Sequence, residues 1–190
     1  MSNYQKYQNN LSFRNKLGRL LWSFTWMFFF RPLNLPVFNG FRIFLLRIFG
    51  SKIGKGCKVN ATIKVWAPWN LEMGNLVAIG FGAMIYNPGK ISIGSKVTVS
   101  QRTHLCSATH DYTLPSNPLV TKPIRIEDRA WVAADAFVGP GVVVGEGGIV
   151  GARAAVFRDV FPWTIVGGNP AKFIKDRVLE GEKTVEEILL

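Results

Sequence analysis

The sequence predicts an all-β solenoid, a parallel β-helix in which short strands wind around a triangular core. The first observation behind this fold class is a six-residue period that runs from residue 53 to residue 156 of the 190-residue chain. Fifteen aliphatic positions fall into five sets of three, with two extra residues after the first set and after the second. These positions are Ile53, Val59, Val65, Met73, Ile79, Ile85, Ile93, Val99, Leu105, Ile126, Val132, Val138, Val144, Val150 and Val156.

Small residues at a fixed offset from the aliphatic positions are the second observation. Ala130, Ala136, Gly148 and Ala154 each stand two positions before an aliphatic residue, where a triangular coil turns its corner. A period of six fits neither the 3.6-residue turn of an α-helix nor the two-residue alternation of a hairpin. It fits a coil of three six-residue units, each of which contributes one short strand, one turn and one inward aliphatic side chain.

Residues 1–50 differ from the repeats and are predicted to form a helical N-terminal segment, followed by the solenoid over residues 51–170 and a C-terminal tail or short helix over residues 171–190. Two stretches of helical periodicity are separated by prolines. The first consists of Phe13, Leu17, Leu20, Leu21, Phe24 and Phe28. The second consists of Val37, Phe41, Phe44, Leu45 and Ile48. Two interpretations are open: the helices pack on the solenoid, or part of their aromatic surface enters a membrane interface.

Charge is distributed unevenly along the chain. Residues 1–71 contain eleven Lys or Arg and no acidic residue, whereas residues 72–190 contain twelve of each sign. This asymmetry suggests an anionic partner. The alternatives are a membrane surface, a nucleic acid and a phosphorylated substrate. No nucleic-acid motif accompanies the charge, so we expect no nucleic-acid partner. The run LLWSFTWMFFF is about half the roughly 20 residues of a spanning helix, so we expect peripheral membrane contact through residues 12–50 rather than a span.

The few residues that bind metals or form disulfides are scattered. Cys57 and Cys106 are the only cysteines and lie in no C-x-x-C pattern, so we expect both to be reduced. Cys106 is interpreted as a small filler rather than a nucleophile. Because the two histidines and the two cysteines are dispersed, no metal site is expected.

The six-residue period is interrupted over residues 107–123, which begin with SATHDY and continue with Pro, Thr and Asn. The interruption is too long for a turn and predicts an excursion loop that leaves the coil. His110 stands near the start of this loop, where an imidazole can take part in proton transfer, although a lone loop histidine is more often a surface residue. His104 precedes the inward Leu105 and is expected on the outer surface.

Several stretches resemble the hexapeptide-repeat acyltransferases. LCSATHDY, the run PIRIEDRAWVAADAFVG and the closing GGNPAK resemble the galactoside and maltose O-acetyltransferase group. FRIFLLRIFGSKIGKG and THD look most like its colanic-acid-biosynthesis acetyltransferase subfamily, and the resemblance covers roughly residues 12–178. It implies a left-handed β-helix, a homotrimer, and an acetyl-CoA site without metal in each cleft between neighbouring β-helices.

The resemblance also implies roles for individual residues. His110, on a loop from one subunit, would be the general base that faces the thioester of acetyl-CoA, and Asp111 is a candidate to orient its ring. Small alanines would let pantetheine amides approach the backbone, and basic residues would meet the nucleotide phosphates. Phe157 departs from the threonine that the family commonly has. The positions expected to bind acetyl-CoA are Ala134, Ala152, Phe157, Arg158, Lys172, Lys175 and Trp131.

The acceptor that the resemblance implies is a saccharide hydroxyl in exopolysaccharide or other surface-glycan biosynthesis. Gly82 stands where galactoside-type enzymes have an Asn, so we expect an acceptor other than a free galactoside. The basic aromatic N-terminus suits a saccharide on a polyprenyl diphosphate, which places the protein in the cytoplasm at the inner face of the membrane. The alternatives are N-acetylation of an amino sugar or a small xenobiotic, a non-catalytic β-helix scaffold, and zinc-dependent hydration, which the two histidines fit poorly.

Overall fold

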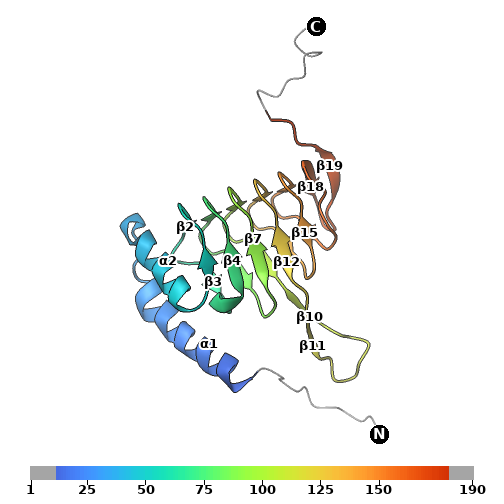
Figure 1. The fold of residues 1–190 in the computed structure, drawn as a ribbon. Coiled ribbons are helices and arrows are strands. Elements are labelled where there is room, and N and C mark those ends of the chain that lie inside the picture. The colour runs from blue at the N-terminus through green and yellow to red at the C-terminus, as the bar shows by residue number, and fades with distance from the viewer. Residues whose placement is uncertain (1–11, 180–190) are drawn as a thin grey trace.

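A computed structural model describes residues 12–179 and confirms the predicted solenoid. Short strands wind around a triangular core, with the N-terminal helices at one end and a β-hairpin at the other (Figure 1). Each of the three sides of the solenoid is one sheet, and all strand pairs between successive coils are parallel.

The three sheets are named here by the order in which the chain visits them. Sheet A consists of β1 (Lys52–Ile53), β4 (Leu71–Met73), β7 (Ile91–Ile93), β12 (Ile124–Ile126) and β15 (Val143–Val144). Sheet B consists of β2 (Lys58–Val59), β5 (Ala78–Ile79), β8 (Thr98–Val99), β13 (Trp131–Val132), β16 (Ile149–Val150), β18 (Thr164–Gly167) and β19 (Lys172–Asp176). Sheet C consists of β3 (Lys64–Val65), β6 (Met84–Tyr86), β9 (His104–Cys106), β14 (Phe137–Val138) and β17 (Ala155–Val156).

The core is the column of aliphatic side chains predicted from the six-residue period. All fifteen positions are buried, and none of them is more than 9% exposed. They stack in register from coil to coil, as where Ile79, Val99, Val132 and Val150 pair in succession along sheet B. Each coil therefore covers the apolar ends of its neighbour, and the core continues for the length of the solenoid.

The glycines that follow inward residues permit close stacking of the coils. A Cβ atom placed on Gly54 would lie 2.5 Å from the carbonyl oxygen of Gly74, and one placed on Gly74 would lie 2.8 Å from the nitrogen of Ser95. The left-handed backbone conformation falls two positions further on, at Gly56 (φ 69°) after Gly54 and at the non-glycine residue Leu76 (φ 59°) after Gly74. Gly54 and Gly74 are thus required for space between coils rather than for a left-handed turn.

The N-terminal helices cover the first end of the solenoid (Figure 1). They consist of α1 (Phe13–Thr25), the π-helical η1 (Trp26–Phe30), the short 3-10 helix η2 (Pro36–Phe38) and α2 (Asn39–Ile48), and a further short helix, η3 (Pro68–Asn70), precedes β4. The indole nitrogens of Trp22 and Trp26 donate to the carbonyls of Val65 and Ile63, both at 2.7 Å. Within residues 12–179, no helix combines the length and the apolar character that a bilayer crossing requires.

α1 and η1 pack on the solenoid through residues other than those that carry the sequence periodicity, whereas α2 packs through Leu45, which belongs to the second periodic stretch, and through Leu46. Trp22 is 2% exposed and Phe30 is fully buried, whereas Phe13, Leu20 and Phe24 are 77%, 67% and 58% exposed. For α1 and η1, large aromatic side chains and two indole hydrogen bonds, rather than the exposed leucines, form the contact with the coils.

The sequence predicts a tail or a short helix from residue 171. The prediction of a helix is wrong for the residues up to 179 that the structure describes. Residues Lys172–Asp176 form strand β19, which pairs antiparallel with β18. The last coil leaves the edge of β18 unpaired, and the returning chain satisfies its backbone hydrogen-bonding groups. Residues 180–190 lie outside the described residues.

His104 is less exposed than the sequence suggests. It lies on the outer side of sheet C, but its ring packs edge-on against Phe137 with centroids 5.4 Å apart. Burial lowers the pKa of His104, because desolvation disfavours the imidazolium.

We expect Ile85→Ala to lower the free energy of unfolding by about 2–5 kcal/mol and Ile85→Val by about 0.5–1.5 kcal/mol. Ile85 is fully buried in the middle of the column, so the larger truncation leaves a cavity between two coils. Urea denaturation of both variants at one protein concentration measures the difference. Equal stability of the alanine variant and the wild type would contradict the stacked-core description.

The lowered pKa of His104 makes the stability of the fold pH-dependent. Below the ordinary histidine pKa near ~6.5 the unfolded chain binds a proton at this site while the folded chain resists it, so stability is lost as the pH falls. We expect the wild type to lose more unfolding free energy than His104→Phe between about pH 7.5 and pH 5.5. Denaturation of both proteins at the two pH values tests this, and equal losses would show that His104 is solvated in the folded state.

Candidate active site

The predicted excursion loop is a β-hairpin that leaves the solenoid at the corner between sheets C and A. Its strands β10 (Ala108–His110) and β11 (Leu119–Thr121) are antiparallel, with His110 opposite Leu119. Ser107 fixes the base of the hairpin, because its buried hydroxyl donates to the carbonyl of Gly89 at 2.9 Å and accepts from the nitrogen of Gly89 at 3.0 Å. The hairpin projects away from the coils (Figure 1).

His110 is an exposed residue at the end of β10, with a defined ring orientation. Its Nδ1 atom lies 2.7 Å from the carbonyl oxygen of Asn117 on the other side of the hairpin. A carbonyl oxygen can only accept a hydrogen bond, so Nδ1 carries the hydrogen in the neutral ring. The lone pair of the neutral imidazole is therefore on Nε2, which is the form that a general base requires.

Asp111 helps to shape the loop that carries His110. Its Oδ1 atom accepts hydrogen bonds from the backbone nitrogen of Thr113 at 3.0 Å and from the Thr113 hydroxyl at 2.6 Å. These hydrogen bonds hold the pKa of the Asp111 carboxyl below its usual value. The orienting contact at Nδ1 of His110 is thus supplied by Asn117, a residue that sequence reasoning missed. Asn117 has φ 44° and precedes a proline, and the Asn-Pro pair is the signal in the sequence for such a turn.

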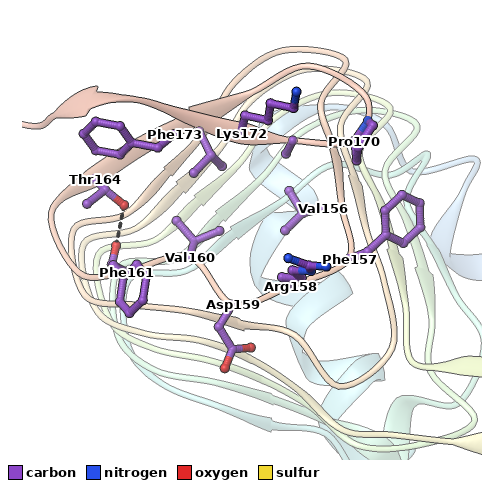
Figure 2. A pocket seen from close by; sticks show the side chains of 12 residues that line it. Val156, Phe157, Arg158, Asp159, Val160, Phe161, Thr164, Pro170, Lys172 and Phe173 are labelled. Atoms are coloured by element: carbon purple, nitrogen blue, oxygen red, sulfur yellow. Dashed lines mark hydrogen bonds between the residues drawn. The ribbon is translucent and has the colours of Figure 1, made fainter.

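A cleft of about 520 Å³ lies at the C-terminal end of the solenoid. It brings together three of the predicted cofactor residues, Phe157, Arg158 and Lys172 (Figure 2). Val156 and Val160, at the end of the aliphatic column, contribute apolar lining, and the turn before β19 covers one side. The carboxylate of Asp159 also lines the cleft and accepts a hydrogen bond from the nitrogen of Val143 at 2.8 Å. Two cations and an apolar surface, with this one carboxylate, suit a ligand that carries both phosphate and apolar groups.

The other predicted cofactor residues lie outside this cleft. Ala134 and Ala152 occupy the same corner of successive coils, between sheets B and C, and the carbonyl of Ala134 accepts from the nitrogen of Arg153 at 2.9 Å. Trp131 is on the outer side of sheet B, where its indole donates to the hydroxyl of Ser100 at 2.9 Å. Lys175 is exposed on β19 and is not among the residues that line the cleft. In a single chain the predicted residues therefore lie in two places: the C-terminal cleft, and the corner between sheets B and C with the adjoining face of sheet B.

The hairpin and the cleft share one edge of the solenoid. β9, β14 and β17 are successive strands of sheet C, with the hairpin base after β9 and Phe157 after β17. Two strand spacings separate them, which is about 10 Å along the solenoid. A row of rings links the two ends, because Phe137 contacts His104 and also lies 5.6 Å from Phe157 between ring centroids.

A second groove of about 540 Å³ lies between α1 and the N-terminal strands of sheet C. Its walls include Trp66 and Tyr86, whose rings meet edge-on at 5.7 Å, and the guanidinium of Arg19 lies 4.0 Å from the centre of the Trp66 ring. Tyr86 is the strand partner of Cys106. The groove is thus adjacent to the strand that leads into the catalytic candidate His110.

Among residues 12–179, no group of three or more histidine, cysteine or acidic side chains is placed to hold a metal ion. Both cysteines are free, with Cys57 buried and Cys106 half-buried. The sulfur of Cys106 lies 3.2 Å from the carbonyl oxygen of Ala108, at the start of the hairpin.

Comparison with known proteins gives a relative in sequence and several in structure, although no family model matches the chain. The protein WcaF of Escherichia coli strain K12, described as a colanic acid biosynthesis acetyltransferase, is 39% identical over 137 residues, which cover 72% of this chain and 75% of WcaF.

Solved structures share the fold at lower identity. A hexapeptide-repeat acetyltransferase of Vibrio cholerae, complexed with acetyl coenzyme A, has a TM-score of 0.78 at 23% identity, covering 91% of this chain and 94% of that chain. A galactoside acetyltransferase in complex with coenzyme A has a TM-score of 0.79 at 21% identity, covering 93% of this chain and 89% of that chain. The similarity to WcaF, together with this shared fold, shows that the chain belongs to the WcaF family of hexapeptide-repeat acetyltransferases.

Proposed function

We propose that the protein transfers an acetyl group from acetyl-CoA to a hydroxyl of a saccharide used in exopolysaccharide or surface-glycan assembly, with His110 as the general base. The observation that carries this proposal is the 2.7 Å contact between Nδ1 of His110 and the carbonyl of Asn117, which assigns the basic lone pair to Nε2. The relation to WcaF, described as a colanic acid biosynthesis acetyltransferase, supports the acceptor class.

The proposed chemistry is direct transfer without an acyl-enzyme. Nε2 of His110 takes the proton of the acceptor hydroxyl as its oxygen attacks the carbonyl carbon of the thioester. The carbon–sulfur bond then breaks, and the proton passes from Nε2 to the leaving sulfur of CoA. The Asn117 carbonyl stabilises the imidazolium that exists between these two proton transfers, because it accepts a hydrogen bond from Nδ1 in both states.

The C-terminal cleft is the proposed site for the nucleotide end of acetyl-CoA. Arg158 and Lys172 supply positive charge for the phosphates, and the apolar lining from Val156 and Val160 contacts the remaining surface. The pantetheine arm then runs along the edge that the cleft shares with the hairpin, toward His110.

A homotrimer explains why the predicted residues lie on two edges of one chain. In this arrangement the projecting hairpin of one subunit and the corner with Ala134 and Ala152 of a neighbour form opposite walls of one cleft. Trp131, on the exposed side of sheet B, extends the second wall. The exposure of His110 in a single chain supports this assignment, because a base that works in a closed site needs a second wall to exclude water.

The groove beneath α1 is the proposed site for the acceptor. Rings such as Trp66 and Tyr86 provide apolar faces on which sugar rings stack, and Arg19 and Lys64 supply positive charge at the same groove. These cations suit an acceptor that also carries a phosphate group, such as a saccharide attached to a polyprenyl diphosphate.

We expect His110→Ala to lower kcat by about 10²–10⁴-fold, the usual contribution of a positioned general base. Release of free CoA in the presence of acetyl-CoA and an acceptor glycan measures the rate. The matched control is His104→Phe, which replaces the other histidine and should retain turnover. Wild-type turnover of a folded His110→Ala protein would refute the assignment.

We expect Lys172→Ala to raise the KM for acetyl-CoA several-fold with little change in kcat, because the side chain contacts a part of the donor remote from the reaction. Lys175→Ala is the control, since Lys175 is on the same strand but outside the cleft lining. Steady-state kinetics with varied acetyl-CoA distinguish the two. Equal effects of both substitutions would indicate a diffuse electrostatic attraction rather than a defined phosphate site.

A further inference from the structure

The N-terminal helix α1 presents a continuous apolar stripe to solvent. Its members are spaced by three or four residues and each is between 44% and 77% exposed. The stripe consists of Phe13, Leu17, Leu20, Leu21, Phe24 and Phe28. These residues follow the periodicity of a helix face that is normally buried, so their exposure calls for a partner.

A second apolar stripe lies on η2 and α2. Val37, Phe41, Phe44 and Ile48 recur at helical spacing, and they are 78%, 38%, 54% and 62% exposed. Both stripes belong to helices at the N-terminal end of the solenoid (Figure 1). No comparable run of exposed apolar residues occurs in the coils between residues 51 and 156, where the inward positions are buried.

The orientation of the helices is fixed by contacts on their opposite faces. Gly18 faces Trp69 so closely that an added Cβ would lie 3.1 Å from its ring. Arg42, which is 3% exposed, donates to the carbonyl of Val59 at 3.0 Å and to that of Leu33. Trp22 and Trp26 hold α1 through their indole hydrogen bonds. The stripes cannot turn inward without losing these buried hydrogen bonds, so they stay directed outward.

The charge around the stripes is entirely positive. The first acidic residue of the chain is Glu72, so both helices and the segments between them carry cations alone. Arg14, Lys16 and Arg31 are exposed beside the apolar stripe of α1 and η1. Among the described residues, the ion pairs include no cation from residues 12–50.

We propose that the two apolar stripes and their flanking cations form a surface that lies on an anionic lipid bilayer. An amphipathic helix with apolar and aromatic residues on one face and cations beside them is suited to the boundary between headgroups and acyl chains. Cations near an anionic bilayer are attracted to its surface, and aromatic side chains favour the interface. The contact is peripheral, since α1 with 13 residues and the contiguous η1 with 5 are together shorter than the roughly 20 residues that a span requires.

Charge complementarity favours lipid over a second copy of the chain as the occupant. Two copies that met through these stripes would bring two sets of cations together without an acidic residue from either N-terminal segment to offset them. A bilayer that contains acidic phospholipids supplies the missing negative charge over the whole surface. The proposal concerns binding alone and does not depend on the acetyl acceptor or on His110.

The test is co-sedimentation of the full chain with vesicles of phosphatidylcholine alone and vesicles of equal parts phosphatidylcholine and phosphatidylglycerol. We expect binding to the anionic vesicles that weakens as salt is added. Phe24→Ser/Phe28→Ser should reduce the affinity at least about tenfold, because each side chain loses its apolar transfer into the interface. Arg14→Gln/Lys16→Gln should reduce it by a similar factor and flatten the salt dependence.

Matched controls separate the surface from general effects of substitution. Leu76→Ser replaces a residue on a coil corner that is 56% exposed, close to the 58% of Phe24, and should bind like the wild type. Lys122→Gln removes an exposed cation next to the hairpin and should also bind like the wild type. Circular dichroism melts confirm that the variants fold.

Two outcomes would overturn the proposal. One is wild-type binding to anionic vesicles by a folded Phe24→Ser/Phe28→Ser protein. The other is absence of vesicle binding together with a lower molar mass of that variant in light scattering, which would identify the stripes as a contact between copies of the chain.

Discussion

The structure depends on the stacking of coils in register, which requires one inward aliphatic residue per side and room between the coils where glycines meet. Ile79, Val99, Val132 and Val150 show the result along sheet B, since each pairs with the next and none has more than slight exposure. Everything else is attached to this column: the helices at its beginning, the hairpin at one corner, and the C-terminal cleft at its end. The site is therefore as well fixed as the register of the coils.

The sequence predicted the column because its signal is local and repeated. Each six-residue unit contains its own inward residue and its own corner, so fifteen weak signals agree on one period. Helix periodicity in the N-terminal segment was equally clear, but it marks an apolar face without saying what covers that face. The face toward the solenoid is instead made by Trp22, Trp26 and Gly18, whose roles depend on contacts with residues 63–69.

The sequence predicted which residues belong to the candidate site, but it did not predict which atoms they contact. His110 stood out through the interruption of the repeat, yet the partner of its Nδ1 is a backbone carbonyl, whose position depends on the turn at Asn117 and not on the chemistry of a side chain. The strand at Lys172–Asp176 was missed for a related reason, because the open edge of β18 decides its conformation and not its own sequence. Phe157, Arg158 and Lys172 meet in one cleft only because the chain reverses between them.

The hairpin leaves and re-enters the solenoid at a single corner, and Ser107 closes its base with two hydrogen bonds to Gly89. After the excursion, β12 pairs with β7 as though the intervening residues were absent. The register between the coils therefore does not depend on the length or the composition of this loop. The segment that carries His110 is thus structurally separate from the scaffold that holds it in place.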